Sequence, residues 1–397
     1  MKRACFLAAL LGGCTGFTPT CTDLASDLAY CDVRPTELAC DELSADDKTG
    51  LETALIEDGC RAVWTPEGEV DPRMCTAFGW DCPAPLGDAP AALATQATLV
   101  FVGGIDGRDE FDWNPRILEE VGALAGTAPR RVRLPPWSPI ATRAAALDRA
   151  LEEIQGPVNL ICYAVAGLDC RYLVSPGGLY ETDPDRRAAI AARVRSVTTI
   201  SSAHRGTEVA TVALRALEGD RGDEVLDALL GRDGPRPSQE VVREALRELG
   251  TGYAAAFNER VVDAPEVYYQ SFAAVSHVLG QPWFPSESSV RRYCGTGAVE
   301  PLVPFDVGVR DTMSELLFAT VPFSGRTVGA DGLSIQSPSD GQVSVDSARW
   351  GVFRGCLPAD HYDVVGQFED QGPDPITGFD AARFYQRVAA DLATRGF

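Results

Sequence analysis

Short runs of uninterrupted apolar residues recur along the chain from residue 98 onward, and they limit its possible folds more than any other feature. The segment 98–102 reads TLVFV and is followed by two glycines. Such a run suits a strand buried on both faces, as in a parallel sheet covered by helices. Over 140–154, apolar residues recur at helical spacing. Strands that alternate with helices predict an α/β fold with a parallel sheet. The four expected strands are 98–102, 157–162, 196–201 and 267–272.

Cysteines set the N-terminal part of the chain apart. Six of the 12 lie between Cys21 and Cys82, with no C-x-x-C pair and no histidine near them. A zinc site is the alternative explanation for so dense a run, but it needs ligand pairs that this spacing lacks. The run therefore favours a disulfide-rich module in an oxidising compartment. We expect this module over 15–82, a Pro- and Ala-rich linker over 83–97, and a larger domain over 98–397.

The N-terminus resembles an export signal. Lys2 and Arg3 precede an apolar run, Ala4–Leu11, which is too short to span a bilayer. The run continues into the letters LGGC, which resemble the lipobox of bacterial lipoproteins and end on Cys14. The resemblance implies a signal peptide over 1–14 and an acylated Cys14 that tethers an exported protein to the bacterial cell envelope, at the outer membrane or cell surface. The alternative is an ordinary signal that is cleaved a little later.

The charge of the chain limits the classes of molecule that it can bind. Its formal net charge is −22, whereas binding a nucleic-acid backbone requires clustered Lys and Arg. We therefore expect no nucleic-acid partner. No other apolar stretch reaches the roughly 18 residues that a membrane span needs.

The segment 158–173 carries the clearest resemblance to a known family. It reads VNLICYAVAGLDCRYL and resembles the strand, sharp turn and helix of bacterial triacylglycerol lipases, V-N-L-I-G-H-S-x-G-G-L-x-x-R-Y. In these α/β-hydrolases the turn presents the nucleophilic serine. The pattern places Ala164 at the serine, Cys162 at the first glycine and Tyr163 at the histidine. A methyl group cannot attack a carbonyl carbon, so the resemblance implies an α/β-hydrolase domain without its nucleophile.

A second segment resembles the oxyanion loop of the same family. FVGGIDG at 101–107 is similar to its V-H-G-L-x-G, with Gly103 at the histidine. The resemblance implies that the backbone N–H groups of Ile105 and Val165 would hold the oxyanion. Because these donors belong to the backbone, they survive changes of side chain. The likeness extends to two more segments, 197–210 and 255–274.

The C-terminal part resembles the family's catalytic acid and base. SDGQVSVDSARWG and DHYDVVGQ imply that Asp340 is the acid and His361 the base. The carboxylate would hold the imidazole in one tautomer, and the imidazole would take the proton of a nucleophile. Asp331 is a rival acid, because it also precedes a glycine and a leucine. His204 fits a brace for a loop better than a catalytic base.

Those lipases also carry a structural calcium ion. The resemblance implies carboxylate ligands at Asp311 and Asp363 and backbone carbonyl ligands at Gln367 and Gln371. Hard oxygen ligands of this kind suit calcium. The ion would hold the loop of His361. The alternative is that both carboxylates are ordinary surface groups.

Two pairs of cysteines lie in the larger domain. We expect Cys294 and Cys356 to form a disulfide, because both lie in the C-terminal half of an exported protein. Cys162 and Cys170 either pair or stay buried and reduced, and the sequence leaves both outcomes open.

A charged, helical stretch at 211–260 lies between two expected strands. Insertions over one end of a sheet often act as lids. A plain pair of surface helices is the alternative.

Three functions are compatible with this sequence. The first, which we favour, is a pseudo-hydrolase that binds a lipid, an ester or a partner protein without cleaving it. The second is an active carboxylic-ester hydrolase that uses another nucleophile, such as Cys162 or a serine elsewhere, and the retained Asp340 and His361 favour it. The third is a surface protein that binds a protein partner through its cysteine-rich module.

Overall fold

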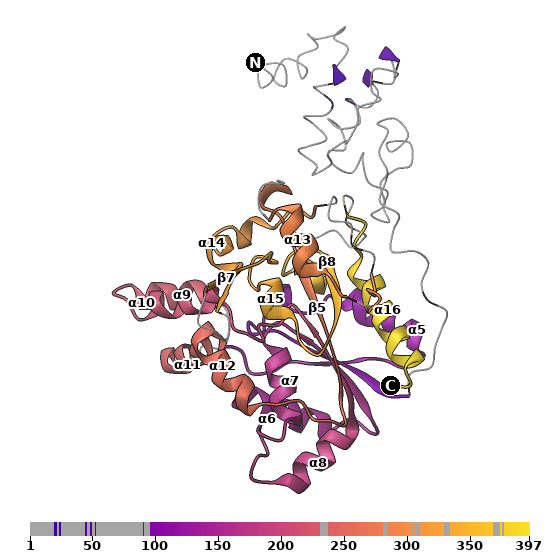
Figure 1. Cartoon of the computed structure of the whole chain (residues 1–397), viewed down its shortest axis with the longest axis vertical. Coiled ribbons are helices and arrows are strands. Elements are labelled where there is room, and N and C mark those ends of the chain that lie inside the picture. Colours follow the sequence, from indigo (N-terminus) through magenta and orange to yellow (C-terminus); the bar gives the residue numbers. More distant parts are fainter. Residues whose placement is uncertain are drawn as a thin grey trace. The chain divides into compact units, whose positions relative to one another are not determined.

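The structure is a computed structural model (Figure 1). It describes residues 96–230, 237–280, 285–297, 299–303, 305, 310–328, 334–367, 374 and 377–397, with isolated positions between 20 and 90. Cys14 and most of the expected cysteine-rich module lie outside the described residues. The chain divides into two compact units, and nearly all described residues belong to the unit formed by Pro85–Glu369 and Phe379–Phe397. In the N-terminal region, Cys21 is disulfide-bonded.

A parallel sheet occupies the centre of the described domain. Its six strands follow the spatial order β2–β1–β3–β4–β5–β8 in the described residues. The four apolar runs of the sequence form β1, β3, β4 and β5, so the expected parallel arrangement is confirmed. The short, arginine-rich β2 and the glycine-interrupted β8 lack that signal. The strands are β1 (Thr98–Val102), β2 (Arg130–Val132), β3 (Val158–Tyr163), β4 (Val194–Ile200), β5 (Tyr268–Val275) and β8 (Val352–Pro358).

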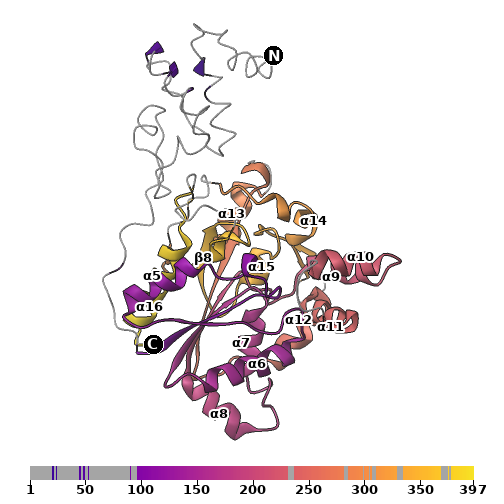
Figure 2. The same cartoon turned by 180° about the vertical axis from the view of Figure 1, so that it is seen from behind.

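Side chains alternate along the strands between two helical layers. In β1, Leu99 and Phe101 pack against one layer, whereas Val100 and Val102 pack against the other. The first layer consists of α5 (Pro115–Ala125) and α16 (Ala381–Thr394). The second consists of α6 (Ile140–Glu152), α7 (Ala166–Val174) and α8 (Pro184–Arg193). Figures 1 and 2 show the two layers on opposite faces of the sheet.

Helices fill the segment between β4 and β5. They are α9 (Glu208–Leu217), α10 (Gly222–Leu230), α11 (Gln239–Leu249) and α12 (Thr251–Arg260). Apolar residues of this insertion form one cluster with Trp137 and Leu168 of the main domain. The insertion expected at 211–260 is therefore helical and begins slightly earlier. Its action as a lid stays a prediction.

Shorter elements connect the rest of the described chain. They are η3 (Asp109–Phe111), η4 (Val278–Gly280), α13 (Glu287–Cys294), η5 (Glu315–Leu317), α14 (Val321–Ser324), α15 (Val345–Ala348), η6 (Asp363–Val365) and the antiparallel pair β6 (Arg326–Val328) and β7 (Ser334–Gln336). Across the described residues, no helix combines the length and apolar character that crossing a membrane would require.

A disulfide ties α13 to the edge of the sheet. Cys294, the last residue of α13, bonds to Cys356 in β8. This pair is the one expected from the sequence and is confirmed. It closes a long loop, since 62 positions separate the two cysteines. A cross-link of that span restricts the unfolded chain more than a short one does.

We expect that replacing both Cys294 and Cys356 with alanine lowers the free energy of unfolding by about 2–4 kcal/mol, because the unfolded chain regains the freedom of the loop. Urea unfolding followed by fluorescence measures the change. Ser288→Ala, an exposed change on the same helix, should stay within about 0.5 kcal/mol of the wild type. Equal stabilities of the wild type and the double variant would show that the bridge contributes nothing.

Candidate active site

The chain passes from strand to helix in a very short turn around Ala164. β3 ends at Tyr163 and α7 begins at Ala166. Ala164 has a φ of 53°, a left-handed conformation that an alanine adopts only when its surroundings impose it. Its N–H donates to the carbonyl of Ile200 (3.0 Å), and its own carbonyl accepts from the N–H of Gly167 (3.2 Å). The turn thus has the strained form expected of a nucleophile-bearing elbow, but it carries a methyl group.

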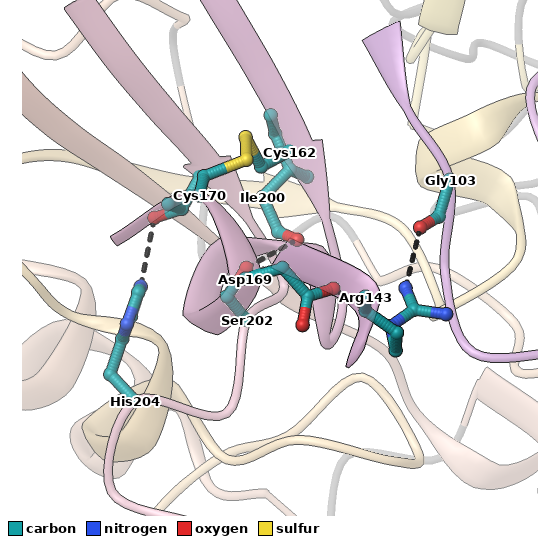
Figure 3. The surroundings of a disulfide bond; sticks show 9 residues. Gly103, Arg143, Cys162, Asp169, Cys170, Ile200, Ser202 and His204 are labelled. Atoms are coloured by element: carbon teal, nitrogen blue, oxygen red, sulfur yellow. Dashed lines mark hydrogen bonds and ion pairs between the residues drawn. A yellow bond between two sulfur atoms is a disulfide. The ribbon is translucent and has the colours of Figure 1, made fainter. Parts of the chain in front are cut away.

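Cys162 points away from the tip of this turn. Because side chains alternate along β3, Cys162 falls in the apolar cluster of the α6–α8 layer. There its sulfur is bonded to that of Cys170 in α7, and both residues are fully buried (Figure 3). A disulfide sulfur is not a thiolate, which is the nucleophilic form of cysteine. The suggestion that Cys162 is an alternative nucleophile is therefore wrong for this disulfide-bonded form of the protein.

His361 and Asp340 lie together at the carboxyl end of the sheet. The Nδ1 of His361 is 2.8 Å from the Oδ2 of Asp340, and the His361 N–H donates to the Asp340 carbonyl (2.9 Å). The other carboxylate oxygen accepts from the N–H groups of Gln342 (2.9 Å) and Val343 (2.7 Å). Asp340 is fully buried and His361 is 8 % exposed. The rival acid, Asp331, lies outside the described residues.

Tyr163 connects the turn to the loop of His361. Its hydroxyl donates to the backbone carbonyl of His361 (2.8 Å), and the centroids of the two rings are 5.0 Å apart. Burial raises the pKa of Tyr163 well above its ordinary value, so the hydroxyl keeps its proton and remains a donor. From the sequence, Tyr163 stood out only as a departure from the lipase pattern. Its hydrogen bond to His361, 198 positions away, cannot be recognised from the residues next to Tyr163 in the sequence.

The loop after β1 approaches the turn closely. A Cβ built on Gly104 would lie 3.1 Å from the ring of Tyr163 and 3.8 Å from the Cβ of Ala164. A glycine here therefore lets the two backbones come together. The N–H groups of Ile105 and Val165 donate to no described residue. These are the two donors that the sequence placed in the oxyanion hole, and they belong to the two segments that meet at Gly104 and Ala164.

A side chain at the position of Gly103 would meet Asp112. A Cβ on Gly103 would lie 2.6 Å from the Oδ1 of Asp112. Asp112 is buried and accepts two hydrogen bonds from the guanidinium of Arg131, at 2.6 and 3.0 Å. This ion pair occupies the space that a side chain at position 103 would need.

A buried arginine orients the loop that follows β1. Arg143 of α6 donates to the carbonyl of Gly103 (3.2 Å; Figure 3). It also donates to the carbonyl of Gly104 (2.9 Å) and to Asp169 of α7 (2.8 Å). Neither side chain of the ion pair is exposed. Since a trans peptide points its C=O and N–H in opposite directions, the bond to Gly104 turns the N–H of Ile105 away from Arg143. Burial raises the pKa of Asp169 to about 6, although Arg143 opposes this shift.

The sequence contained a signal for Arg143 that helical spacing alone could have revealed. Arg143 lies three residues after Ile140 and four before Leu147, on the apolar stripe of α6. A charged residue on a buried stripe needs a partner. The identity of that partner, Asp169, depends on how α6 packs on α7.

His204 has a structural environment. It is fully buried, with Nδ1 3.2 Å from Arg171 and Nε2 3.0 Å from the hydroxyl of Thr199. Burial lowers its pKa well below the ordinary value, and nearby arginines add to this effect. These contacts fit the bracing role expected for it.

The residues expected to bind calcium are only partly described. Asp311 and Asp363 are both buried, at 2 % and 6 % exposure, so they are not ordinary surface carboxylates. Gln367 donates to the carbonyls of Asp109 and Asp112, and Gln371 lies outside the described residues. No three or more His, Cys, Asp or Glu side chains of the described part are grouped to hold a metal ion. The expected calcium ligands include only two such side chains, Asp311 and Asp363, because the other two ligands are backbone carbonyls. The expected set is therefore too small to count as a group of this kind.

A third carboxylate connects the two segments that carry Asp311 and Asp363. Asp360 is fully buried, and its Oδ2 accepts from the N–H of Ser314 (2.8 Å). Its Oδ1 accepts from Asp363 (3.0 Å), and its own N–H donates to the Oδ2 of Asp363 (2.7 Å). Burial raises the pKa of Asp360. Asp360 thus joins the two segments that the calcium ion was expected to hold.

Known proteins similar to this chain include lipases and esterases. No family model matches the chain. It is 26 % identical over 285 residues to triacylglycerol lipase 2 of Saccharomyces cerevisiae, which covers 67 % of this chain and 68 % of that protein. A metagenomic carboxyl esterase, MGS0156, matches with a TM-score of 0.51 and 18 % identity over 79 % of this chain and 80 % of its own. EstA from Clostridium botulinum matches with a TM-score of 0.48 and 16 % identity, over 78 % and 92 %. The expected α/β-hydrolase fold is confirmed.

We expect Asp169→Leu to lower the free energy of unfolding by about 3–5 kcal/mol, because it leaves the buried Arg143 guanidinium without its counter-charge. Urea unfolding at neutral pH measures the loss. The matched variant is Asp220→Leu, which changes an exposed aspartate and should shift stability by less than about 0.5 kcal/mol. If both variants unfold alike, the ion pair does not stabilise the loop as described.

Proposed function

Because the chain is a lipase- and esterase-like protein of the α/β-hydrolase fold, we propose that it is a pseudo-hydrolase that binds a lipid or a carboxylic ester without cleaving it. The observation that carries this proposal is the methyl group of Ala164 at the tip of the turn. Acyl transfer in such a site begins with attack by a hydroxyl or thiol held at that tip. Loss of the serine in a serine hydrolase lowers turnover by about 10⁶-fold.

The remaining groups of the site support binding. The N–H groups of Ile105 and Val165 donate to no described residue, so both can donate to a carbonyl oxygen of a ligand, and Arg143 holds the loop that carries one of them. Hydrogen-bond donors of this kind act on a bound carbonyl whether or not a bond is then broken. The paired His361 and Asp340 add one more polar group beside the turn.

Apolar side chains around the two donors support a lipid-like ligand. Val165 belongs to an apolar cluster with Trp137, Leu168 and Leu246, and the side chain of Ile105 packs against the same cluster. Leu246 comes from α11 of the helical insertion. An acyl chain beside these residues would be removed from water, which favours binding by roughly 0.8 kcal/mol for each buried CH₂ group.

An active hydrolase is the second candidate, and the retained pair of His361 and Asp340 favours it. A base and its orienting acid have an obvious use in ester hydrolysis. This candidate still requires a nucleophile, and Cys162 has no free thiol in the disulfide form.

Export and acylation of Cys14 remain part of the favoured proposal. They are supported by the basic and apolar N-terminal pattern.

We expect the wild-type protein to show no turnover of short or long p-nitrophenyl esters beyond slow background hydrolysis, because no nucleophile stands at the turn. Ala164→Ser should raise the rate by at least about 10³-fold, since the frame of the site is retained. Adding His361→Ala to Ala164→Ser should abolish that gain. Clear wild-type turnover that disappears in His361→Ala alone would instead establish an active hydrolase.

We also propose that calcium binds at Asp311 and Asp363, together with the carbonyls of Gln367 and Gln371. Two buried carboxylates beside the loop of His361 support this, since hard oxygen ligands suit the ion. The chemistry supplied by the ion would be structural, because it would neutralise charge that burial disfavours.

Calcium at 100 times its Kd should stabilise the protein by about 2.7 kcal/mol, seen as a higher Tm in thermal unfolding. A chelator should reverse the increase. Asp363→Asn should remove the response, whereas Asp220→Asn, an exposed control, should keep it. A wild-type Tm that does not respond to millimolar calcium would exclude the site.

A further inference from the structure

We propose that Cys162 and Cys170 are positioning residues, and that their disulfide holds Ala164 in its left-handed conformation and thereby fixes the direction of the Val165 N–H. The conformational claim goes beyond the proposed function and needs no ligand for its test. Only its consequence for a bound carbonyl oxygen rests on that function, because Val165 carries one of the two expected donors.

Ala164 adopts a backbone conformation that its own side chain disfavours. Its φ of 53° lies in the left-handed region, where a Cβ comes close to the following carbonyl oxygen. A methyl group makes no polar contact that could offset this cost. Strained conformations of this kind persist only where the surrounding structure imposes them. The constraint on Ala164 must therefore come from the residues around the turn.

The disulfide encloses the whole turn in a covalent ring. Cys162 is the last but one residue of β3, and Cys170 lies in α7, eight positions later. The Cα atoms of the two cysteines are 6.8 Å apart, whereas eight extended residues could span about 26–29 Å. The few residues between the strand and the helix, Ala164 among them, consequently have little room for another conformation.

Both ends of this ring are attached to rigid elements. Cys162 pairs in the sheet with Val102 of β1 and Thr199 of β4. Both cysteines are fully buried, in the apolar cluster that the sheet forms with α6–α8. Figure 3 shows the bridge between the strand and the helix. Because neither end can move freely, the bridge transmits its constraint to the turn.

Two other contacts hold the neighbourhood of the turn, but neither joins its two ends. Tyr163 donates to the carbonyl of His361 (2.8 Å), which fixes the end of β3 on the other face of the sheet. Asp169 accepts from Arg143 (2.8 Å), which fixes α7 to α6. Of these contacts and the disulfide, only the disulfide connects the end of β3 directly to α7.

The conformation of Ala164 decides where the N–H of Val165 points. The peptide unit between the two residues is planar, so a change in the ψ of Ala164 turns that N–H in another direction. The loop of Ile105 would stay in place, because Arg143 holds it through the Gly104 carbonyl. Without the disulfide, the two expected donors would no longer keep one arrangement.

Hydrogen exchange of the full-length protein, resolved to single amides by mass spectrometry, tests the inference. The amides at positions 164 and 167 serve as probes of the turn, because both N–H groups are hydrogen-bonded there. Val100, in the middle of β1, serves as the probe of global unfolding. In Cys162→Ala/Cys170→Ala, we expect exchange at the turn to accelerate about tenfold more than at Val100, a difference of about 1.4 kcal/mol.

Two further variants separate an effect on Ala164 from general support. Cys294→Ala/Cys356→Ala removes a disulfide elsewhere in the domain and should produce no excess exchange at the turn. Ala164→Gly relieves the strain, because glycine adopts a positive φ readily. With glycine at position 164, loss of the Cys162–Cys170 bridge should leave most of the excess absent. An equal excess with alanine and with glycine would overturn the inference.

Reduction of the wild type repeats the test without leaving a cavity. Dithiothreitol passes two electrons and two protons to the bridge, which becomes two thiols, and is itself oxidised to a cyclic disulfide. Because the bridge is buried, the protein is reduced in urea and returned to buffer that contains the dithiol. We expect the same excess exchange at positions 164 and 167, and its loss in Ala164→Gly.

The remaining outcomes also decide the question. Turn amides that stay protected in both the cysteine-free and the reduced protein would overturn the inference. A bridge-free protein that folds only with Ala164→Gly would support it, whereas unfolding with either residue would show that the bridge acts on the whole domain and would overturn it. Turnover of p-nitrophenyl esters bears on the proposed function alone, so the two proposals can fail separately.

Discussion

The alternation of side chains along β3 is the constraint on which the site depends. Every residue of β3 is buried, and the strand pairs in parallel with β1 on one side and β4 on the other. A shift of one residue would exchange the two faces, so the register is strongly specified. Cys162 is therefore directed to the layer of α7 and Tyr163 to the layer that contains the loop of His361. Ala164 follows at the end of the strand, where the chain must turn.

The turn is held by its neighbours and not by the side chain at its tip. The disulfide between Cys162 and Cys170 connects the end of β3 to α7, and the Arg143–Asp169 pair connects α7 to α6 and to the loop after β1. A buried ion pair stabilises only while both partners are present, so this link depends on two residues outside the turn. A methyl group at position 164 is compatible with all of these contacts. The form of the turn therefore does not depend on a polar side chain at position 164.

The remaining polar groups have a different use when no covalent bond is formed. In an acyl-transfer enzyme, oxyanion donors are valuable because they bind charge that develops in the transition state. In the proposed pseudo-hydrolase, the N–H groups of Ile105 and Val165 would instead act on the ground state of the bound ligand. In the proposed pseudo-hydrolase, His361, whose Nδ1 lies 2.8 Å from Asp340, would be one more polar group beside that ligand. The site then becomes a set of directional hydrogen-bonding groups beside an apolar cluster, which is an arrangement suited to recognition.

The sequence by itself determined the parallel sheet, because uninterrupted apolar runs are required for strands buried on both faces. It also placed a sharp turn at Ala164 and predicted Asp340 and His361 as an acid and a base that act together. These residues lie in contiguous motifs. The sequence did not predict β2 and β8, because neither strand is a continuous apolar run. Only the tertiary structure decided that Cys162 pairs with Cys170, that Tyr163 contacts His361, and that Arg143 orients Gly104. The physical reason is that these contacts join residues on different elements, and their partners are set by how strands and helices pack. Local spacing reports only that a residue is buried.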